Sequence, residues 1–272
     1  MKNTQIISVI NQKGGVGKTT TVINLATSLA FRKKKILVID LDPQGNATTG
    51  FGLRNDDDTK TIYDVLNGNS NFENTIKNTK IDNLKLVSSN VDLSGLEIET
   101  ASENRRAFLL KDKIETFINS SKNDFSYIFI DCPPSLSLLT IMSLVVANSL
   151  VVPLQAEFFA LEGLTQLMKT IDRIKIKLNP QLKIRGVLLT MFDKRNKLSA
   201  QVDADARKFL NEKVYHTVIP RNVRLSEAPS HGIPILIYDK LCAGSISYSN
   251  FAEEFLKQEN ILESAAWLWR IT

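Results

Sequence analysis

The chain has 272 residues, of which 43% are hydrophobic and 23% charged, a balance that is typical of a soluble globular protein and excludes a disordered or fibrous one. Its two cysteines, Cys132 and Cys242, lie far apart, and its two histidines show no metal-ligand spacing, so we expect a reduced, cytoplasmic protein without a signal peptide. The net charge of +5 is weak support for a polyanionic partner.

Apolar, β-branched runs alternate with helical patterns along the chain. Strands are predicted at 5–11, 35–40, 84–88, 126–131, 149–153, 183–190 and 214–218, with a further candidate at 234–238. Helices are predicted at 19–31, 103–119, 136–147, 160–177, 198–210 and 246–258, and the polar stretch 52–80 is expected to be irregular. This alternation predicts an α/β fold, with a mostly parallel twisted sheet and helices on both faces, in a single domain over residues 1–272.

The segment between the first strand and the first helix is a glycine-rich loop that reads KGGVGKTT at residues 13–20. Strand, glycine loop and helix in this order form the context of a phosphate-binding loop, so the fold is predicted to be a P-loop NTPase. Glycines let backbone N–H groups approach phosphate oxygens, and the helix adds its positive dipole end. The residues predicted to bind ATP here are Lys13, Gly14, Gly15, Val16, Gly17, Lys18, Thr19 and Thr20.

Within this loop, Lys18 is predicted to reach the β- and γ-phosphates, and the Thr19 hydroxyl to bind Mg²⁺. The loop departs from the standard pattern at one position, where Gln12 replaces the expected glycine and is followed by a second lysine, Lys13. One bound triphosphate does not need that second lysine. Lys13 is either a solvated loop charge or a residue with a role of its own.

Acidic residues follow two of the predicted strands. Asp40 and Asp42 close the second strand, where open parallel sheets bind ligands, and a carboxylate there can hold a Mg²⁺-bound water or orient an attacking water. The plainer alternative is a helix cap or a turn, because Asp-Pro-Gln-Gly favours a turn. The apolar run 127–130 closes on Asp131 and resembles a Walker B strand, whose Asp supports Mg²⁺ through water. Cys132 beside it is predicted to be a small buried residue.

Two longer stretches have unusual charge. Residues 132–156 carry no charge over a length that could span a membrane, but Pro153 would break a helix, so a loop, a buried helix and a buried strand are predicted instead. Residues 185–224 contain nine lysines and arginines against four acids, which strengthens the expectation of a polyanionic partner.

Five motifs together resemble the ParA/Soj partitioning ATPases, a family of the deviant Walker A P-loop class. They are KGGVGKTT at 13–20, DLDPQGNAT at 40–48, DCPPS at 131–135, VPLQAEFFALEGL at 152–164 and TVIPRNVRLSEAPSHG at 217–232. The resemblance runs from about residue 5 to 257. It implies an ATPase that forms an ATP-bound sandwich homodimer, binds double-stranded DNA nonspecifically in the nucleoid, and is stimulated by a ParB-type centromere-binding protein.

The resemblance also implies residue roles. Lys13 matches the signature lysine that reaches the ATP of the partner subunit, Asp42 matches the acid needed for hydrolysis, and Asp40 and Asp131 support Mg²⁺ through water. Pro220 and Asn222 match the segment that frames the adenine. Arg195 and Arg224 match arginines linked to DNA binding.

Residues 258–272 look unlike the family, and no helix-turn-helix extension precedes the loop, so repression at a specific operator is not expected. The aromatic run 265–269 could touch a membrane as in the related MinD group, but it lacks a basic face, so core packing or fraying is expected and no stable membrane association. The main alternative is nonetheless a MinD-type ATPase, which would bind a membrane rather than DNA. A metabolic P-loop enzyme would need a second constellation of substrate-binding residues.

Overall fold

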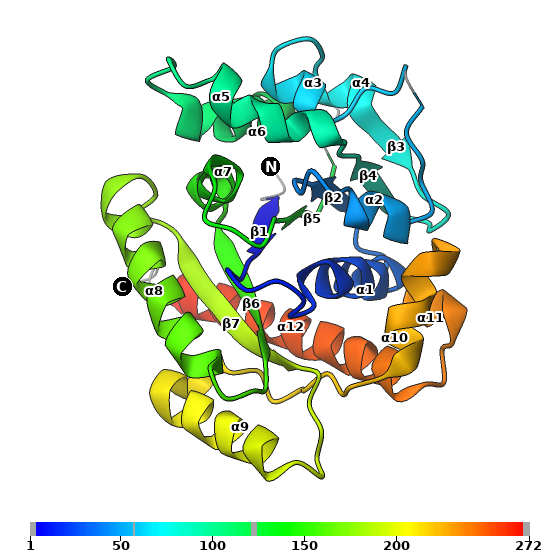
Figure 1. Ribbon diagram of the computed structural model, residues 1–272, viewed down its shortest axis with the longest axis vertical. Helices are drawn as coiled ribbons and strands as arrows, with labels where there is room; N and C mark the ends of the chain where they lie inside the picture. The colour runs from blue at the N-terminus through cyan, green and yellow to red at the C-terminus, as the bar shows by residue number, and fades with distance from the viewer. Residues whose placement is uncertain (1–3, 57, 121–123, 269–272) are drawn as a thin grey trace.

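A computed structural model describes residues 4–56, 58–120 and 124–268, with side chains up to residue 259. Its centre is a seven-stranded sheet in the order β3-β4-β2-β5-β1-β6-β7 (Figure 1). The strands are β1 (Gln5–Val9), β2 (Ile36–Asp40), β3 (Ile76–Asn78), β4 (Leu84–Val87), β5 (Tyr127–Asp131), β6 (Ser149–Gln155) and β7 (Lys183–Thr190). All neighbouring pairs are parallel except β3 with β4.

Helices cover both faces of the sheet, as predicted (Figure 1). The longer ones are α1 (Lys18–Phe31), α6 (Leu109–Asn119), α7 (Leu138–Val146), α8 (Ala160–Lys177), α9 (Lys197–Leu210) and α12 (Ala243–Leu268). The short α-helices are α2 (Asn46–Gly50), α3 (Ile62–Leu66), α4 (Phe72–Thr75), α5 (Leu96–Glu99), α10 (Val223–Glu227) and α11 (Ile235–Tyr238). The 3₁₀ turns are η1 (Val91–Gly95), η2 (Arg106–Phe108), η3 (Asn211–Lys213) and η4 (Ala228–His231).

Two apolar clusters form the core, one on each face of the sheet. Side chains of α6, α7 and α8 pack on one face, and those of α1, α11 and α12 on the other. The strands between them are buried on both sides, which explains why their sequences are continuously apolar rather than alternating. This arrangement places the carboxyl ends of the parallel strands β1, β2 and β5 side by side at one edge of the sheet.

The prediction of a strand at 214–218 is wrong. Only Val214 forms an isolated bridge, with Val187. One backbone hydrogen bond joins the segment to β7, from the Tyr215 amide to the Val187 carbonyl oxygen at 3.0 Å. Side chains bind much of the remaining backbone: the Arg207 guanidinium donates to the carbonyl oxygens of Val214 (3.3 Å) and Tyr215 (3.0 Å). The Glu254 carboxylate accepts from the amides of the next two residues at 2.7 and 2.9 Å. With its donors and acceptors already paired in this way, the segment does not extend the sheet.

Three further predictions need correction. The candidate strand 234–238 is the short helix α11, in which the Pro234 carbonyl accepts from two following amides, at 3.0 Å each. The stretch 52–80 is irregular only in part, because it contains the short elements α3, α4 and β3, and the helix predicted from 103 begins at Leu109 after a 3₁₀ turn. Stretch 132–156 does resolve into a loop, a buried helix and a buried strand.

The C-terminal helix α12 extends ten residues beyond the predicted end at 258 and reaches Leu268. The expected packing or fraying of the family-atypical tail concerns side chains that lie outside the described residues. Among the helices that the structure describes, none is both long enough and apolar enough to cross a membrane.

Candidate functional site

The glycine-rich loop connects β1 to α1 and adopts a conformation that glycine makes possible. Gly15 and Gly17 have φ angles of +73° and +89°, in the left-handed region that side chains disfavour. The Thr190 hydroxyl, at the end of β7, donates to the carbonyl oxygen of Val16 at 2.8 Å. The end of β7 therefore holds the loop, and helix α1 begins at Lys18.

The two lysines of the loop point to different places. Lys18 is buried, and its ammonium donates to the carbonyl oxygen of Lys13 at 2.9 Å. Burial lowers the pKa of Lys18, and the charge of Asp131 opposes that shift. The Lys13 side chain is 52% exposed and forms an ion pair with Glu157, at the end of β6. Lys13 itself is braced because its amide donates to the side-chain oxygen of Asn11 at 3.0 Å.

Three aspartates converge at the ends of β2 and β5. Asp40 and Asp131 are register partners across the two strands, and both are fully buried. Burial raises the pKa of Asp40 to about 6, although hydrogen bonds from Thr48 act in the opposite direction. Burial, followed by the charge of Asp40, raises the pKa of Asp131 well above its usual range. Asp42 is nearly buried, and its Oδ1 accepts from the amide of Gln44 at 3.0 Å.

Asp131 differs from Asp40 in its partners. Neither of its carboxylate oxygens meets hydrogen-bond geometry with a donor of the described residues. The Thr19 hydroxyl is nonetheless close enough to lower the pKa of Asp131, as is the Lys18 ammonium. A buried carboxylate normally has partners, so these oxygens suit a hydrated cation next to Thr19. Cys132 is buried, as predicted, and burial raises the pKa of its thiol to about 12.

A pocket of about 360 Å³ opens over the glycine loop. It brings together the predicted residues Gly14, Gly15, Gly17, Lys18, Thr19, Thr20 and Asp42. Its other lining residues, which the sequence patterns did not single out, are Ile23, Asn46, Thr49, Pro134, Met191 and Pro229. Asn46 and Thr49 lie in or beside the DLDPQGNAT motif, and Pro134 lies in DCPPS, so their motifs could have indicated them. Met191 gives no sequence signal.

The predicted adenine-framing residues lie near this pocket but do not line it. Pro220 forms an isolated bridge with Phe192, the residue after the lining Met191. Asn222 precedes α10, and its side-chain oxygen is buried without a partner in the described part of the chain. Their role toward a nucleotide stays a prediction.

The predicted DNA-binding arginines are exposed, and each is paired within the chain. Arg195, in the loop before α9, is 90% exposed and binds Asp193 at 3.0 Å. Arg224, in α10, binds Glu227 at 2.9 Å and lies 3.8 Å from Asp239. The basic stretch therefore presents less free positive charge in one copy of the chain than the residue count suggests.

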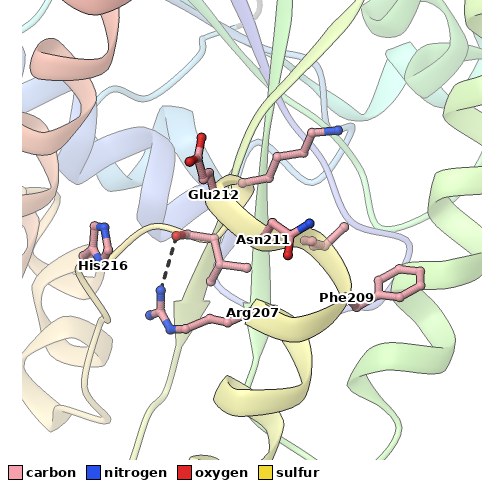
Figure 2. Close-up of a pocket in the computed structure, with 8 residues that line it drawn as sticks. Arg207, Phe209, Asn211, Glu212 and His216 are labelled. Atoms are coloured by element: carbon pink, nitrogen blue, oxygen red, sulfur yellow. Dashed lines mark hydrogen bonds between the residues drawn. The ribbon is translucent and has the colours of Figure 1, made fainter.

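A larger hollow, of about 1140 Å³, lies away from all of these residues, between the end of α9 and the following segment (Figure 2). Arg207, Phe209 and His216 are among its lining residues. The Arg207 guanidinium points to the backbone of Val214, so its charge serves to hold this segment. The smaller pocket, where the loop and the acids meet, is the better candidate for chemistry.

The fold and this combination of loop and acids define a P-loop ATPase. A family model described as an AAA domain matches residues 4–184. The chain is 48% identical over 262 residues to the chromosome partitioning protein ParA of Caulobacter vibrioides, covering 96% of this chain and 97% of that protein. It is 47% identical over 250 residues to the sporulation initiation inhibitor protein Soj of Bacillus subtilis, covering 92% and 97%. The chain therefore belongs to the ParA/Soj family of chromosome-partitioning ATPases.

A solved structure adds a nucleotide-bound example of the fold. The structure named cobyrinic acid a,c-diamide synthase, from Mycobacterium smegmatis with a bound ATP analog and magnesium, is 32% identical and has a TM-score of 0.82. The match covers 94% of this chain and 95% of that one. That protein's name denotes a metabolic enzyme, whereas several relatives of higher identity are named as chromosome-partitioning proteins.

Proposed function

We propose that this chain hydrolyses MgATP in the pocket over the glycine loop and uses the nucleotide to switch between a monomer and a DNA-bound homodimer that partitions DNA. The observation that carries the proposal is the convergence of Lys18, Thr19 and Asp42 on one pocket at the carboxyl ends of parallel strands. Backbone N–H groups of the loop and the Lys18 ammonium would bind the phosphates. The higher identity to partitioning proteins supports this function over a metabolic one.

The residues beside the loop fit a magnesium ion. Thr19 lines the pocket, and the buried oxygens of Asp131 lack protein donors that fit hydrogen-bond geometry within the described residues. The Thr19 hydroxyl would bind the ion directly, and Asp131 would hold its water ligands, with Asp40 behind. A bound magnesium neutralises negative charge that develops on the phosphates.

Asp42 and Lys13 are assigned the hydrolytic roles. Asp42 reaches the pocket wall and carries a carboxylate that can orient an attacking water. Lys13 does not line the pocket of its own chain among the described residues and pairs with Glu157 instead. This position supports a role in trans, in which Lys13 supplies positive charge to the ATP of the partner subunit, as an arginine finger does.

DNA binding is assigned to Arg195 and Arg224, and hydrolysis is proposed to be stimulated by a ParB-type partner. Each arginine has an acidic neighbour, so one copy of the chain would bind DNA weakly. A homodimer presents the two residues twice, which would convert weak contacts into a stronger, ATP-dependent site. Contacts to phosphates carry no base information, so this binding would be nonspecific.

A measurement of ATP binding tests whether the pocket over the glycine loop is the nucleotide site. Lys18→Ala should weaken ATP binding severely and abolish the ATP-dependent dimer, because it removes the buried charge facing the phosphates. Lys80→Ala removes an exposed lysine elsewhere and is the control. Calorimetric titration with ATP and magnesium measures both. ATP affinity of the Lys18 variant within a few-fold of the control would refute the assigned site.

A further inference from the structure

One buried carboxylate closes the loop that carries Asp42. Strand β2 ends at Asp40, and the chain returns to it at Thr48 in α2. The Asp40 Oδ2 accepts both the backbone N–H and the hydroxyl of Thr48, each at 2.7 Å. The Oδ1 accepts the amide of Asp42 at 3.3 Å. Asp40 therefore binds both ends of the 42–48 loop.

The Thr48 hydroxyl makes a second connection. It accepts the amide of Ser89, just after β4, at 3.2 Å. A hydroxyl has one proton, so the proton goes to Asp40 while a lone pair accepts from Ser89. Ser89 also lies close to the loop at Gly45, where an added Cβ would be 3.4 Å from the Ser89 carbonyl oxygen. The hydroxyl thus fixes the loop to the end of the adjacent strand.

From this arrangement we infer that Thr48 is a positioning residue for ATP hydrolysis, which holds Asp42 at the pocket through Asp40 and Ser89. Thr48 is buried and does not itself line the pocket, so it acts through these neighbours. The inference rests on the proposed catalytic role of Asp42. Small displacements of a group that orients a reactant are costly, on the order of 100-fold in rate for about 1 Å. The glycine loop and Lys18, which would bind the phosphates, make no hydrogen bond to Thr48 within the described part of the chain.

The test compares Thr48→Val, which keeps the shape but removes the hydroxyl, with Thr48→Ser, which keeps the hydroxyl. Thr75→Val is the control, because Thr75 is equally buried and its hydroxyl donates to a backbone carbonyl of its own helix. We expect the valine variant to lose about 10-fold or more in kcat while KM for MgATP changes less than about 3-fold. The serine variant and the control should stay within about 3-fold of the unchanged protein in both parameters.

The inference is overturned if Thr48→Val keeps its kcat, if serine fails to restore it, or if the control loses as much. If the valine variant does not fold, Thr48→Ser against Thr48→Ala makes the same comparison, because both lack the methyl group and only one lacks the hydroxyl. Adding Thr48→Val to Asp42→Ala should cause no further loss of kcat. Full turnover in Asp42→Ala would refute the catalytic role of Asp42. If Asp42→Ala is inactive while Thr48→Val keeps its full turnover, only the inference about Thr48 is refuted.

Discussion

The ion pair between Lys13 and Glu157 allows the proposed role of Lys13 to be tested without altering the lysine itself. If Lys13 acts on the partner subunit, each chain must release this pair before the ATP-bound dimer forms. Glu157→Gln removes the competing charge while leaving Lys13 in place. The variant should therefore dimerise more tightly than the unchanged protein when ATP is bound.

The structure limits the size of this effect. The two side chains are 52% and 29% exposed, and pairs of this kind typically contribute about 0.2–1 kcal/mol. A dimer releases two such pairs, so the gain is at most about 2 kcal/mol, or roughly 30-fold in the Kd of the dimer. We expect a strengthening between about 2-fold and 30-fold, which shrinks in high salt because exposed charges are screened.

Sedimentation velocity with magnesium and a non-hydrolysable ATP analogue measures that Kd. Glu162→Gln is the matched control, since Glu162 is an exposed acid in the first turn of α8 and makes no ion pair among the described residues. An unchanged or weaker dimer in Glu157→Gln would refute the reasoning, because it would mean that the pair does not compete with dimerisation. The same shift in the control would assign the effect to net charge alone.

Three more predictions follow from the acids and the arginines. Asp42→Ala should bind ATP and form the dimer but hydrolyse ATP poorly, as single-turnover assays and gel filtration would show; full turnover would move the catalytic role elsewhere. Replacing Arg195 and Arg224 with alanine should leave the dimer intact, weaken DNA binding and lower its salt slope by about one unit for each DNA phosphate that the variant no longer binds. In the absence of nucleotide, the free energy of unfolding should rise as the pH falls from about 7 toward about 5. In this pH range the folded state binds protons more readily than the unfolded chain, because folding raises the pKa of Asp40 to about 6 and also raises that of Asp131. Proton uptake therefore favours the folded state.

The DNA-binding and pH measurements each have a comparison variant. Arg105→Ala with Arg106→Ala removes two arginines just before α6, and Figure 1 shows α6 at the opposite end of the molecule from α9. Unchanged DNA affinity in the double variant of Arg195 and Arg224 would make them ordinary solvated charges. If the dimer bound anionic liposomes and not DNA, a MinD-type function would replace the proposal. For the pH dependence, Asp131→Asn should flatten the slope in urea unfolding, and an unchanged slope would assign it to other groups.

Sequence patterns predicted the fold well where burial alone decides the structure. Strands such as 127–131, buried on both faces, read as continuous apolar runs, and each predicted parallel strand up to β7 is present within two residues of its expected ends. The failures lie where side chains from distant parts of the sequence satisfy the backbone. The apolar run 214–218 looks like a strand, but Glu254 and Arg207 bind its amides and carbonyls. A local pattern holds no information about such partners.

The site shows the same division between local and distant information. The loop residues and Asp42 gather in one pocket, as their motifs predict, because all of them follow strands that end at the same edge of the sheet. Met191 lines that pocket without any sequence signal, since it enters through the end of β7, which packs beside the loop. Thr48 belongs to the DLDPQGNAT motif, but its two-sided hydrogen bonding to Asp40 and Ser89 depends on β4 lying next to β2.

The two lysines of the loop show how the structure adds to the motif. They are five positions apart, yet the fold separates their environments: Lys18 is buried over the acids, and Lys13 lies at the rim beside Glu157. To reach the pocket of its own chain, the Lys13 side chain would have to leave Glu157. The backbone carbonyl oxygen of Lys13 already accepts a hydrogen bond from the Lys18 ammonium. A cation at the rim, held by a weak pair, is better placed to meet a phosphate that approaches from a second copy of the chain. If Lys13 has the proposed role, the strength of that weak pair contributes to the free energy of dimerisation, which is why the substitution at Glu157 tests the role of Lys13.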